Sequence, residues 1–379
     1  MGAFWTLKAK AGLVEMKNMI KWWRRVGTSA IVVGAILVNV SAQTPPGDLT
    51  ELSLEQILSL HIVKRPAAEG EPAVATKELG KWSYGYRYIH AFFSGHRRGT
   101  DSLSNGEVLG GPPNGIVFPI LPTNIRQEAH TFELGYRATD RLSVTVLVPY
   151  IFQSTEHVSL VAGFSEFTID SEGLGDISVT PSWTAWSKGA HAIVLNGGIS
   201  LPIGTINETG DTPGPGPENS LPYTMQIGSG TADLLPGIAY KGAHEQWRWS
   251  LQGLATLRLG RNYRGYTLGN RYALAGRLSY QMRPWLEPIF GMRLQVWDRI
   301  IGSDPNLPAG PPYPATVADP SRYGGEKVNV SLGARFNVTK GALAGSSLEF
   351  HGALPVYQRL NGPQPEEQWQ LNLGWKWNF

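Results

Sequence analysis

Long runs of alternating residues constrain this chain more than any other feature of its sequence. In residues 369–379 every second residue is Trp, Leu or Phe, and Gln, Asn, Gly and Lys lie between them. Similar alternation occupies residues 82–92, 247–259 and 328–338. Because successive side chains of a β-strand point to opposite faces, each run predicts a strand with one apolar or aromatic face. Runs of about ten residues or more exceed the usual strand length of soluble proteins and match that of a tilted transmembrane strand.

The alternation extends over most of the chain after residue 80 and predicts twelve antiparallel strands. We place them at roughly 81–93, 130–139, 141–153, 176–187, 191–202, 233–241, 246–259, 270–282, 285–297, 326–338, 346–357 and 368–379. The short links are residue 140 and residues 188–190, 242–245, 283–284 and 339–345, and the long links are 94–129, 154–175, 203–232, 260–269, 298–325 and 358–367.

Strictly alternating short and long links are typical of bacterial outer-membrane barrels, in which short periplasmic turns alternate with long outer loops. We therefore predict an all-β fold, a transmembrane antiparallel β-barrel of about 12 strands (10–14), over residues 81–379. Both termini of the chain are then expected in the periplasm. The long loops are rich in Gly and Pro, and we expect them to be solvated, although they could fold inward.

The composition excludes several other classes of protein. The chain contains no cysteine, so it has neither disulfides nor a thiolate metal site. It has no run of 18 apolar residues, which argues against a helical membrane protein. The net charge of +3 comes from the N-terminus: residues 1–42 hold six basic residues and one acidic residue, which leaves 27 basic and 29 acidic residues elsewhere. That balance predicts no nucleic-acid partner.

The first 42 residues have the three parts of a secretory signal peptide. Basic residues and tryptophans at 21–25 are followed by an apolar segment at 30–38, and small residues at 40–42 precede Gln43. We predict a signal peptide over residues 1–42 that is cleaved near Ala42. The alternative is an uncleaved membrane anchor, but the apolar segment is too short to cross a bilayer of about 30 Å.

Residues 43–80 are predicted to form a short periplasmic segment before the barrel. Residues 48–51 and 53–56 both fit a helix capping box, and apolar residues recur at helical spacing over 49–62. We predict an amphipathic helix at 49–62, followed by a linker at 66–76. The helix could bind a periplasmic partner, cover the mouth of the barrel, or simply pack on it.

Short motifs rich in glycine and aromatic residues follow one another along the predicted barrel. They lie at 82–88, 95–100, 142–149, 173–177, 201–204 and 228–233. In this order they resemble the outer-membrane family named after the meta-pathway of phenol degradation, whose members are regarded as transporters. The resemblance covers most of residues 80–379. It implies an outer-membrane location and the passage of small molecules, and it offers no catalytic residue.

The C-terminal strand carries a second resemblance. Its aromatic residues Trp375, Trp377 and Phe379 resemble the signal that the barrel-assembly machinery reads. That machinery and the lipid of the outer membrane are therefore predicted partners of the chain.

If the apolar faces of the strands meet lipid, the alternate residues line the lumen. The basic residues at these positions are Arg87, Arg137, Arg248, Arg258, Arg271, Arg277, Arg293, Lys327, Arg335 and Lys376, and the acidic ones are Glu133, Glu287 and Glu349. An excess of Arg and Lys raises the local concentration of anions, as in anion-selective pores. We therefore hypothesise a channel for small solutes, anionic or aromatic compounds such as carboxylates. The alternative is that the arginines are structural and bind carboxylates of the strands and loops.

The sequence contains no motif for an enzyme or a cofactor: no nucleophile elbow, paired-His zinc motif, EF-hand or Walker loop is present. Asp170, Glu172 and Asp176 offer oxygens for Ca²⁺, although Gly175-Asp176 fits a turn at the start of a strand better. Two rival functions remain. One is an outer-membrane lipid-modifying enzyme, which would need a Ser-His pair on a lipid-facing side that the apolar faces do not carry. The other is a structural or ligand-binding closed barrel.

Overall fold

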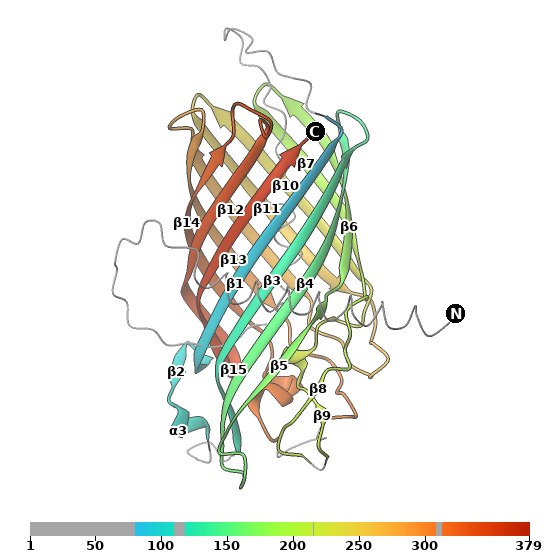
Figure 1. Ribbon diagram of the computed structural model, residues 1–379, viewed down its shortest axis with the longest axis vertical. Helices are drawn as coiled ribbons and strands as arrows, with labels where there is room; N and C mark the ends of the chain where they lie inside the picture. The colour runs from blue at the N-terminus through green and yellow to red at the C-terminus, as the bar shows by residue number, and fades with distance from the viewer. Residues whose placement is uncertain (1–79, 110–117, 215, 308–312) are drawn as a thin grey trace, which may run out of the picture. The chain divides into compact units, whose positions relative to one another are not determined.

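The computed structural model describes residues 80–109, 118–214, 216–307 and 313–379. In it, eleven labelled strands form one closed antiparallel barrel, and β15 pairs with β1 to close the wall (Figure 1). The strands of the wall are β1 (Trp82–Gly99), β3 (Ile120–Arg137), β4 (Leu142–Ser159), β6 (Ile177–Lys188), β7 (His191–Leu201), β10 (Asp233–His244), β11 (Trp247–Arg258), β12 (Arg271–Tyr280), β13 (Leu286–Trp297), β14 (Gly325–Asn337) and β15 (Ser346–Asn378).

The long strand β15 crosses the wall twice. Its residues 347–360 pair antiparallel with β14, and its residues 360–378 pair antiparallel with β1. Since β1 and β14 are separated by nine antiparallel pairings, they run in opposite directions, and β15 must reverse between them. Hydrogen bonds between Gln358 and Glu367 join its two halves. Within the described residues the wall is therefore crossed twelve times, which confirms the predicted number of about twelve strands.

The two ends of the barrel differ in their connections. At one end Trp82 and Phe379 exchange two backbone hydrogen bonds, of 3.2 and 3.0 Å, close to short turns such as 189–190 and 245–246. The other end, at the bottom of Figure 1, carries the long connections. Their elements are β2 (Asp101–Leu103), α3 (Asn105–Val108), β5 (Glu166–Leu174), β8 (Thr209–Gly210), β9 (Asn219–Ser220) and the 3-10 turns η1 (Tyr223–Met225), η2 (Thr316–Ala318) and η3 (Pro320–Arg322).

Three predicted links are wrong at their edges. β1 and β3 extend into the predicted link 94–129, and β4 and its partner β5 occupy most of 154–175. In 358–367 the pairing of β15 extends into the predicted link from both sides of the reversal. The alternation signal fails in these parts because both faces are polar there, as in Arg126-Gln127-Glu128. Backbone pairing continues beyond the lipid layer. The apolar face that marks a strand in the sequence ends where the lipid layer ends.

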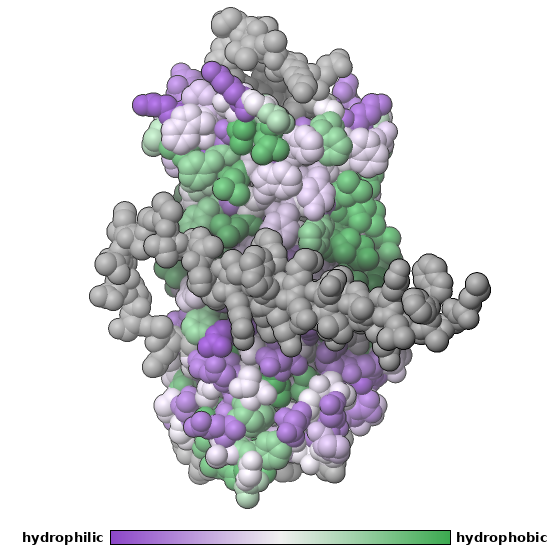
Figure 2. All heavy atoms as spheres, in the orientation of Figure 1, coloured by the Kyte–Doolittle hydropathy of each residue, from purple (hydrophilic) through white to green (hydrophobic). Residues whose placement is uncertain are grey.

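The wall carries its large apolar side chains on the outside. Leu332, Leu354 and Ile238 are 67%, 60% and 52% exposed, whereas Gln127 and Glu287 inside the barrel are 1% and 2% exposed. A soluble protein shows the reverse distribution, and surrounding lipid explains it. Figure 2 shows green and near-white residues over the upper wall, and purple residues at the upper rim and over the lower half. Among the described residues no helix is long and apolar enough to cross a membrane.

The predicted signal peptide at 1–42 lies outside the described residues. So do the predicted helix at 49–62 and the linker that follows it. The signal peptide, the helix and the linker therefore stay predictions.

Candidate functional site

The thirteen charged residues of the predicted lumen lie inside the barrel, and none of them is exposed. At least six of the ten basic ones form ion pairs with carboxylates: Arg248, Arg258, Arg277, Lys327, Arg335 and Lys376. A seventh, Arg137, donates a hydrogen bond to the Gly80 carbonyl at 3.3 Å. The structure thus brings most of these charges together in pairs and networks.

Glu349 on β15 is the centre of the largest network. Arg277 binds it with both terminal nitrogens, at 2.9 and 2.8 Å, and Arg335 binds it at 2.9 Å through Nε and 2.7 Å through Nη2. His351 Nε2 lies 2.5 Å from its other oxygen. Two-point binding of this kind fixes both the position and the orientation of a carboxylate. The network therefore ties β12 and β14 to β15 inside the barrel.

Glu287 on β13 extends this network around the wall. Its carboxylate lies 3.3 Å from Arg335 and 3.4 Å from Arg248, and Ser279 donates a hydrogen bond to it at 2.5 Å. The network thereby reaches β11, so arginines from three strands share two carboxylates.

Glu133 on β3 binds Lys376 on β15 across the intervening strand β1. The residue between them is Gly85, and a Cβ atom there would lie 3.1 Å from the Cβ of Glu133. A glycine at this position leaves the space through which the two side chains meet.

Two inward carboxylates escaped the sequence analysis. Asp233 lies 2.6 Å from Arg258, and Glu367 lies 2.6 Å from Lys327; both acidic side chains are 1% exposed. Asp233 begins β10 at an inward position of the alternation, so strand periodicity could have identified it. Glu367 lies in a predicted link, where no periodicity marked it. The positive excess inside the barrel is therefore smaller than the sequence indicated.

The interior nevertheless keeps a cavity of about 160 Å³ in which positive groups dominate. Arg87, Arg277 and Arg293 line it, with Glu349 as the acidic residue and His351 beside it. Amides and apolar groups complete the lining, among them Asn329, Asn372, Ile289 and Ala353. A second cavity of about 50 Å³, at the end of the barrel that carries the long connections, is lined by Arg271 and the Lys327–Glu367 pair. All ten predicted basic positions are thereby located.

One long connection enters the barrel. Residues 221–229, which we name the plug segment, are buried except for Pro222. Ile227 of this segment packs against Ile89, Ala129 and Ile151, on β1, β3 and β4. Of the two alternatives for the long loops, this one folds inward.

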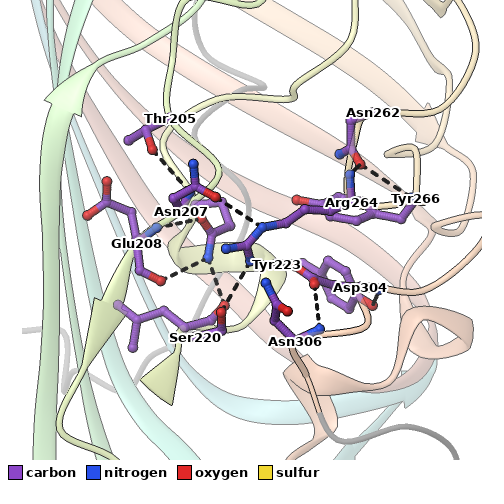
Figure 3. Close-up of polar contacts among 12 residues, drawn as sticks. Thr205, Asn207, Glu208, Ser220, Tyr223, Asn262, Arg264, Tyr266, Asp304 and Asn306 are labelled. Atoms are coloured by element: carbon purple, nitrogen blue, oxygen red, sulfur yellow. Dashed lines mark hydrogen bonds and ion pairs between the residues drawn. The ribbon is translucent and has the colours of Figure 1, made fainter. Parts of the chain in front are cut away.

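Arg264, which the sequence analysis missed, joins three of the long connections (Figure 3). Its Nε donates to Asn207 at 3.1 Å, and its Nη1 donates to Ser220 at 3.2 Å and to Asp304 at 2.7 Å. The backbone N–H of Asp304 donates to the hydroxyl of Tyr223 at 3.0 Å. A single guanidinium thereby ties together the connections after β7, β11 and β13, at the end of the barrel that carries the long connections.

Two tyrosines stabilise this junction from inside. The rings of Tyr223 and Tyr266 meet edge to face at 4.8 Å, and both residues belong to one buried cluster. Burial raises the pKa of both hydroxyl groups. They are therefore neutral at physiological pH and act as hydrogen-bonding groups.

The residues considered for calcium do not form a common site. Asp170 and Glu172 are exposed on β5, whereas Asp176 is buried and its carboxylate accepts hydrogen bonds from Gly204 and Ser229. In the part of the chain that the structure describes, no group of three or more His, Asp or Glu residues is arranged to hold a metal ion.

The predicted assembly residues lie at the seam of the barrel. The ring of Trp375 contacts Tyr84 at 5.8 Å, and the rings of Trp377 and Phe379 lie 4.8 Å apart. Phe379 is half exposed and its backbone pairs with Trp82. These aromatic groups form part of a girdle at the end of the barrel that carries the C-terminus.

No protein-family model and no curated protein sequence matches this chain. Among solved structures the chain is similar to the COG4313 outer membrane channel from Pseudomonas putida F1, with 15% identity, a TM-score of 0.52, and coverage of 82% of this chain and 100% of that chain. The transport unit of the autotransporter AIDA-I from Escherichia coli (9% identity, TM-score 0.44, 88% and 100% covered) and the toluene transporter TbuX from Ralstonia pickettii (10%, 0.37, 79% and 89%) superpose less well. At such identities a likeness shows the fold alone: this chain has the fold of an outer-membrane β-barrel.

Proposed function

We propose that this protein is a channel of the bacterial outer membrane that passes small solutes and prefers anions. The observation that carries the proposal is the cavity inside the barrel, whose lining contains three arginines, Arg87, Arg277 and Arg293, and one carboxylate, Glu349. Among the residues of this lining, positive charge therefore exceeds negative charge.

An excess of one charge in an enclosed site of low dielectric constant attracts counter-ions strongly. Guanidinium groups present paired donors that match a carboxylate, and the apolar side chains of Ile289 and Ala353 lie beside them in the lining, where a hydrocarbon or an aromatic ring would fit. We therefore propose small aliphatic or aromatic carboxylates as the solute class.

The proposal includes a location and a family. An apolar outer wall supports insertion in the outer membrane after cleavage of residues 1–42. One solved structure similar to this chain is named an outer membrane channel, and the motifs of residues 82–233 support membership in the family of the phenol meta-pathway. The barrel-assembly machinery is the proposed partner of Phe379, and residues 49–62 are proposed to face the periplasm.

The test is electrical. We would reconstitute the refolded mature protein in planar bilayers and measure conductance and reversal potential under a KCl gradient. We expect a stepwise conductance with a preference for anions. The double variant Arg87→Gln/Arg293→Gln should weaken that preference, whereas the matched variant Arg141→Gln, at an exposed turn residue, should leave it unchanged.

A preference for cations would refute the electrostatic part of the proposal and keep the channel. No conductance in either direction would favour the second candidate, a closed structural or ligand-binding barrel. That candidate has its own support, since the plug segment and the ion pairs lie inside the barrel.

A further inference from the structure

Three glycine-containing motifs that lie far apart in the sequence meet at one point of the structure. They are residues 173–177, 201–204 and 228–233. The carboxylate of Asp176 accepts hydrogen bonds from the backbone N–H of Gly204 at 3.0 Å, and from the backbone N–H and hydroxyl of Ser229 at 2.9 and 2.6 Å. Asp176 precedes β6 of the wall, whereas Gly204 and Ser229 belong to the connection that carries the plug segment.

The second and third motifs also touch each other directly. A Cβ atom on Gly204 would lie 2.6 Å from the Cα of Gly228, and one on Gly228 would lie 2.2 Å from the carbonyl oxygen of Gly204. The carbonyl of Thr205 accepts from the N–H groups of Ile227 and Gly228, at 3.1 and 2.9 Å. Gly204 and Gly228 thus approach so closely that only residues without a Cβ fit at this contact, which we name the neck.

Beyond the neck, the plug segment is held in the barrel by weaker contacts. Gln153 donates to the carbonyl of Gln226 at 3.3 Å, and Thr155 donates to the sulfur of Met225 at 3.1 Å. The remaining contacts are apolar, such as those of Ile227, or lead to other long connections rather than to the wall, as from Asn262 to the Ser229 carbonyl at 3.1 Å and from Asp304 to the Tyr223 hydroxyl at 3.0 Å. Hydrogen bonds to a carboxylate are about twice as strong as neutral ones. The Asp176 carboxylate is therefore the strongest polar attachment of the inner end of the segment to the wall.

We propose that Asp176 is a latch that holds the plug segment, residues 221–229, inside the lumen, and that release of this latch opens the channel. The proposal rests on the proposed channel function. Asp176 is a positioning residue in this scheme, because it contacts the plug segment and not the solute. The wall does not change when the latch opens; only the segment between β7 and β10 moves.

The absence of cysteine from the chain permits a direct test. A single cysteine in place of Met225, which is fully buried, reports whether the plug segment leaves the interior. We would measure its labelling by a maleimide in the folded full-length protein, alone and combined with Asp176→Asn. We expect labelling to become roughly ten- to hundredfold faster with Asp176→Asn, since one charged acceptor of several hydrogen bonds is lost.

The matched control is Asp170→Asn, an exposed carboxylate on the neighbouring strand β5, which should leave the labelling rate unchanged. A heat-modifiable shift in gel mobility verifies that each variant is folded. If Asp176→Asn fails to fold, Ser229→Ala replaces it; loss of that hydroxyl removes one of the three bonds and should raise the rate by less.

Conductance of the same variants separates the latch from the channel. Faster labelling together with a larger or more frequent open state supports the proposal. Equal labelling of the parent and Asp176→Asn would overturn the latch. Faster labelling with unchanged conductance would overturn the gating role. If neither protein conducts, the channel function itself fails, while the labelling rates still decide whether Asp176 holds the segment.

Discussion

At the scale of single residues, Glu349 makes the clearest prediction. It is 6% exposed and bound by Arg277, Arg335 and His351. Replacing it with glutamine would remove the charged partner that Arg277 and Arg335 share inside the barrel, and Arg335 would keep only Glu287. Removal of one member of a buried ion pair costs about 3–5 kcal/mol, and we expect Glu349→Gln to lower the free energy of unfolding towards the lower end of that range. Urea titration of the protein refolded into lipid vesicles measures it.

The matched control for this prediction is Glu326→Gln. The pair Arg359–Glu326 spans 3.9 Å, and the Arg359 side chain is 60% exposed. Exposed pairs contribute about 0–1 kcal/mol, so we expect a change within that limit. Equal urea midpoints for Glu349→Gln and the parent would show that the network does not stabilise the wall.

At the scale of elements, the neck between Gly204 and Gly228 decides whether the plug segment can enter the barrel. In Gly228→Ala the new methyl group would clash with the backbone of Gly204, so the segment cannot seat as it does in the parent. We expect the amides of residues 221–229 to lose protection from hydrogen exchange, while those of the wall keep it. Hydrogen exchange followed by mass spectrometry measures both.

Gly197→Ala provides the control for the neck, because a Cβ atom at Gly197 on β7 meets no atom within 4 Å. We expect its exchange pattern to equal that of the parent. Protection of residues 221–229 that survives in Gly228→Ala would contradict the assignment of this close contact as a structural requirement.

At the scale of the whole molecule, a change at the seam between β1 and β15 tests whether assembly in cells depends on more than the stability of the fold. Deletion of Phe379 removes the backbone bonds of that residue to Trp82, while the pairing of residues 360–378 with β1 remains. We therefore expect refolding in detergent to change little. In cells, in contrast, we expect far less assembled barrel, because the terminal aromatic residue is the proposed signal for the assembly machinery. Heat-modifiable gel mobility quantifies folded protein in both settings.

Phe336→Ala is the control for the deletion, since Phe336 is 41% exposed on the outer wall and far from the C-terminus in sequence. It should leave assembly in cells near the parental level. Equal assembly of the parent and the chain that lacks Phe379 would refute the proposed role of Phe379 as an assembly signal.

The sequence by itself determined the wall of this protein. Lipid requires an apolar residue at every second position of a strand, so the requirement is local and periodic, and it can be read without knowledge of the partner strands. It located the strands of the wall, the inward side of residues such as Arg277, and the terminal strand with Phe379. Where the strands leave the lipid, as at Arg126-Gln127-Glu128, the periodicity ends although the pairing continues.

Only the tertiary structure decided which inward charges meet and which loop enters the lumen. Arg277 and Glu349 are 72 positions apart, and Glu133 and Lys376 are 243 apart. Their contact depends on how the strands are aligned after the barrel closes, which no local pattern encodes. The motifs around Asp176, Gly204 and Ser229 were visible in the sequence, but their meeting depends on two glycines that approach across the neck of a loop. Local periodicity fixed the wall, and long-range packing fixed its contents.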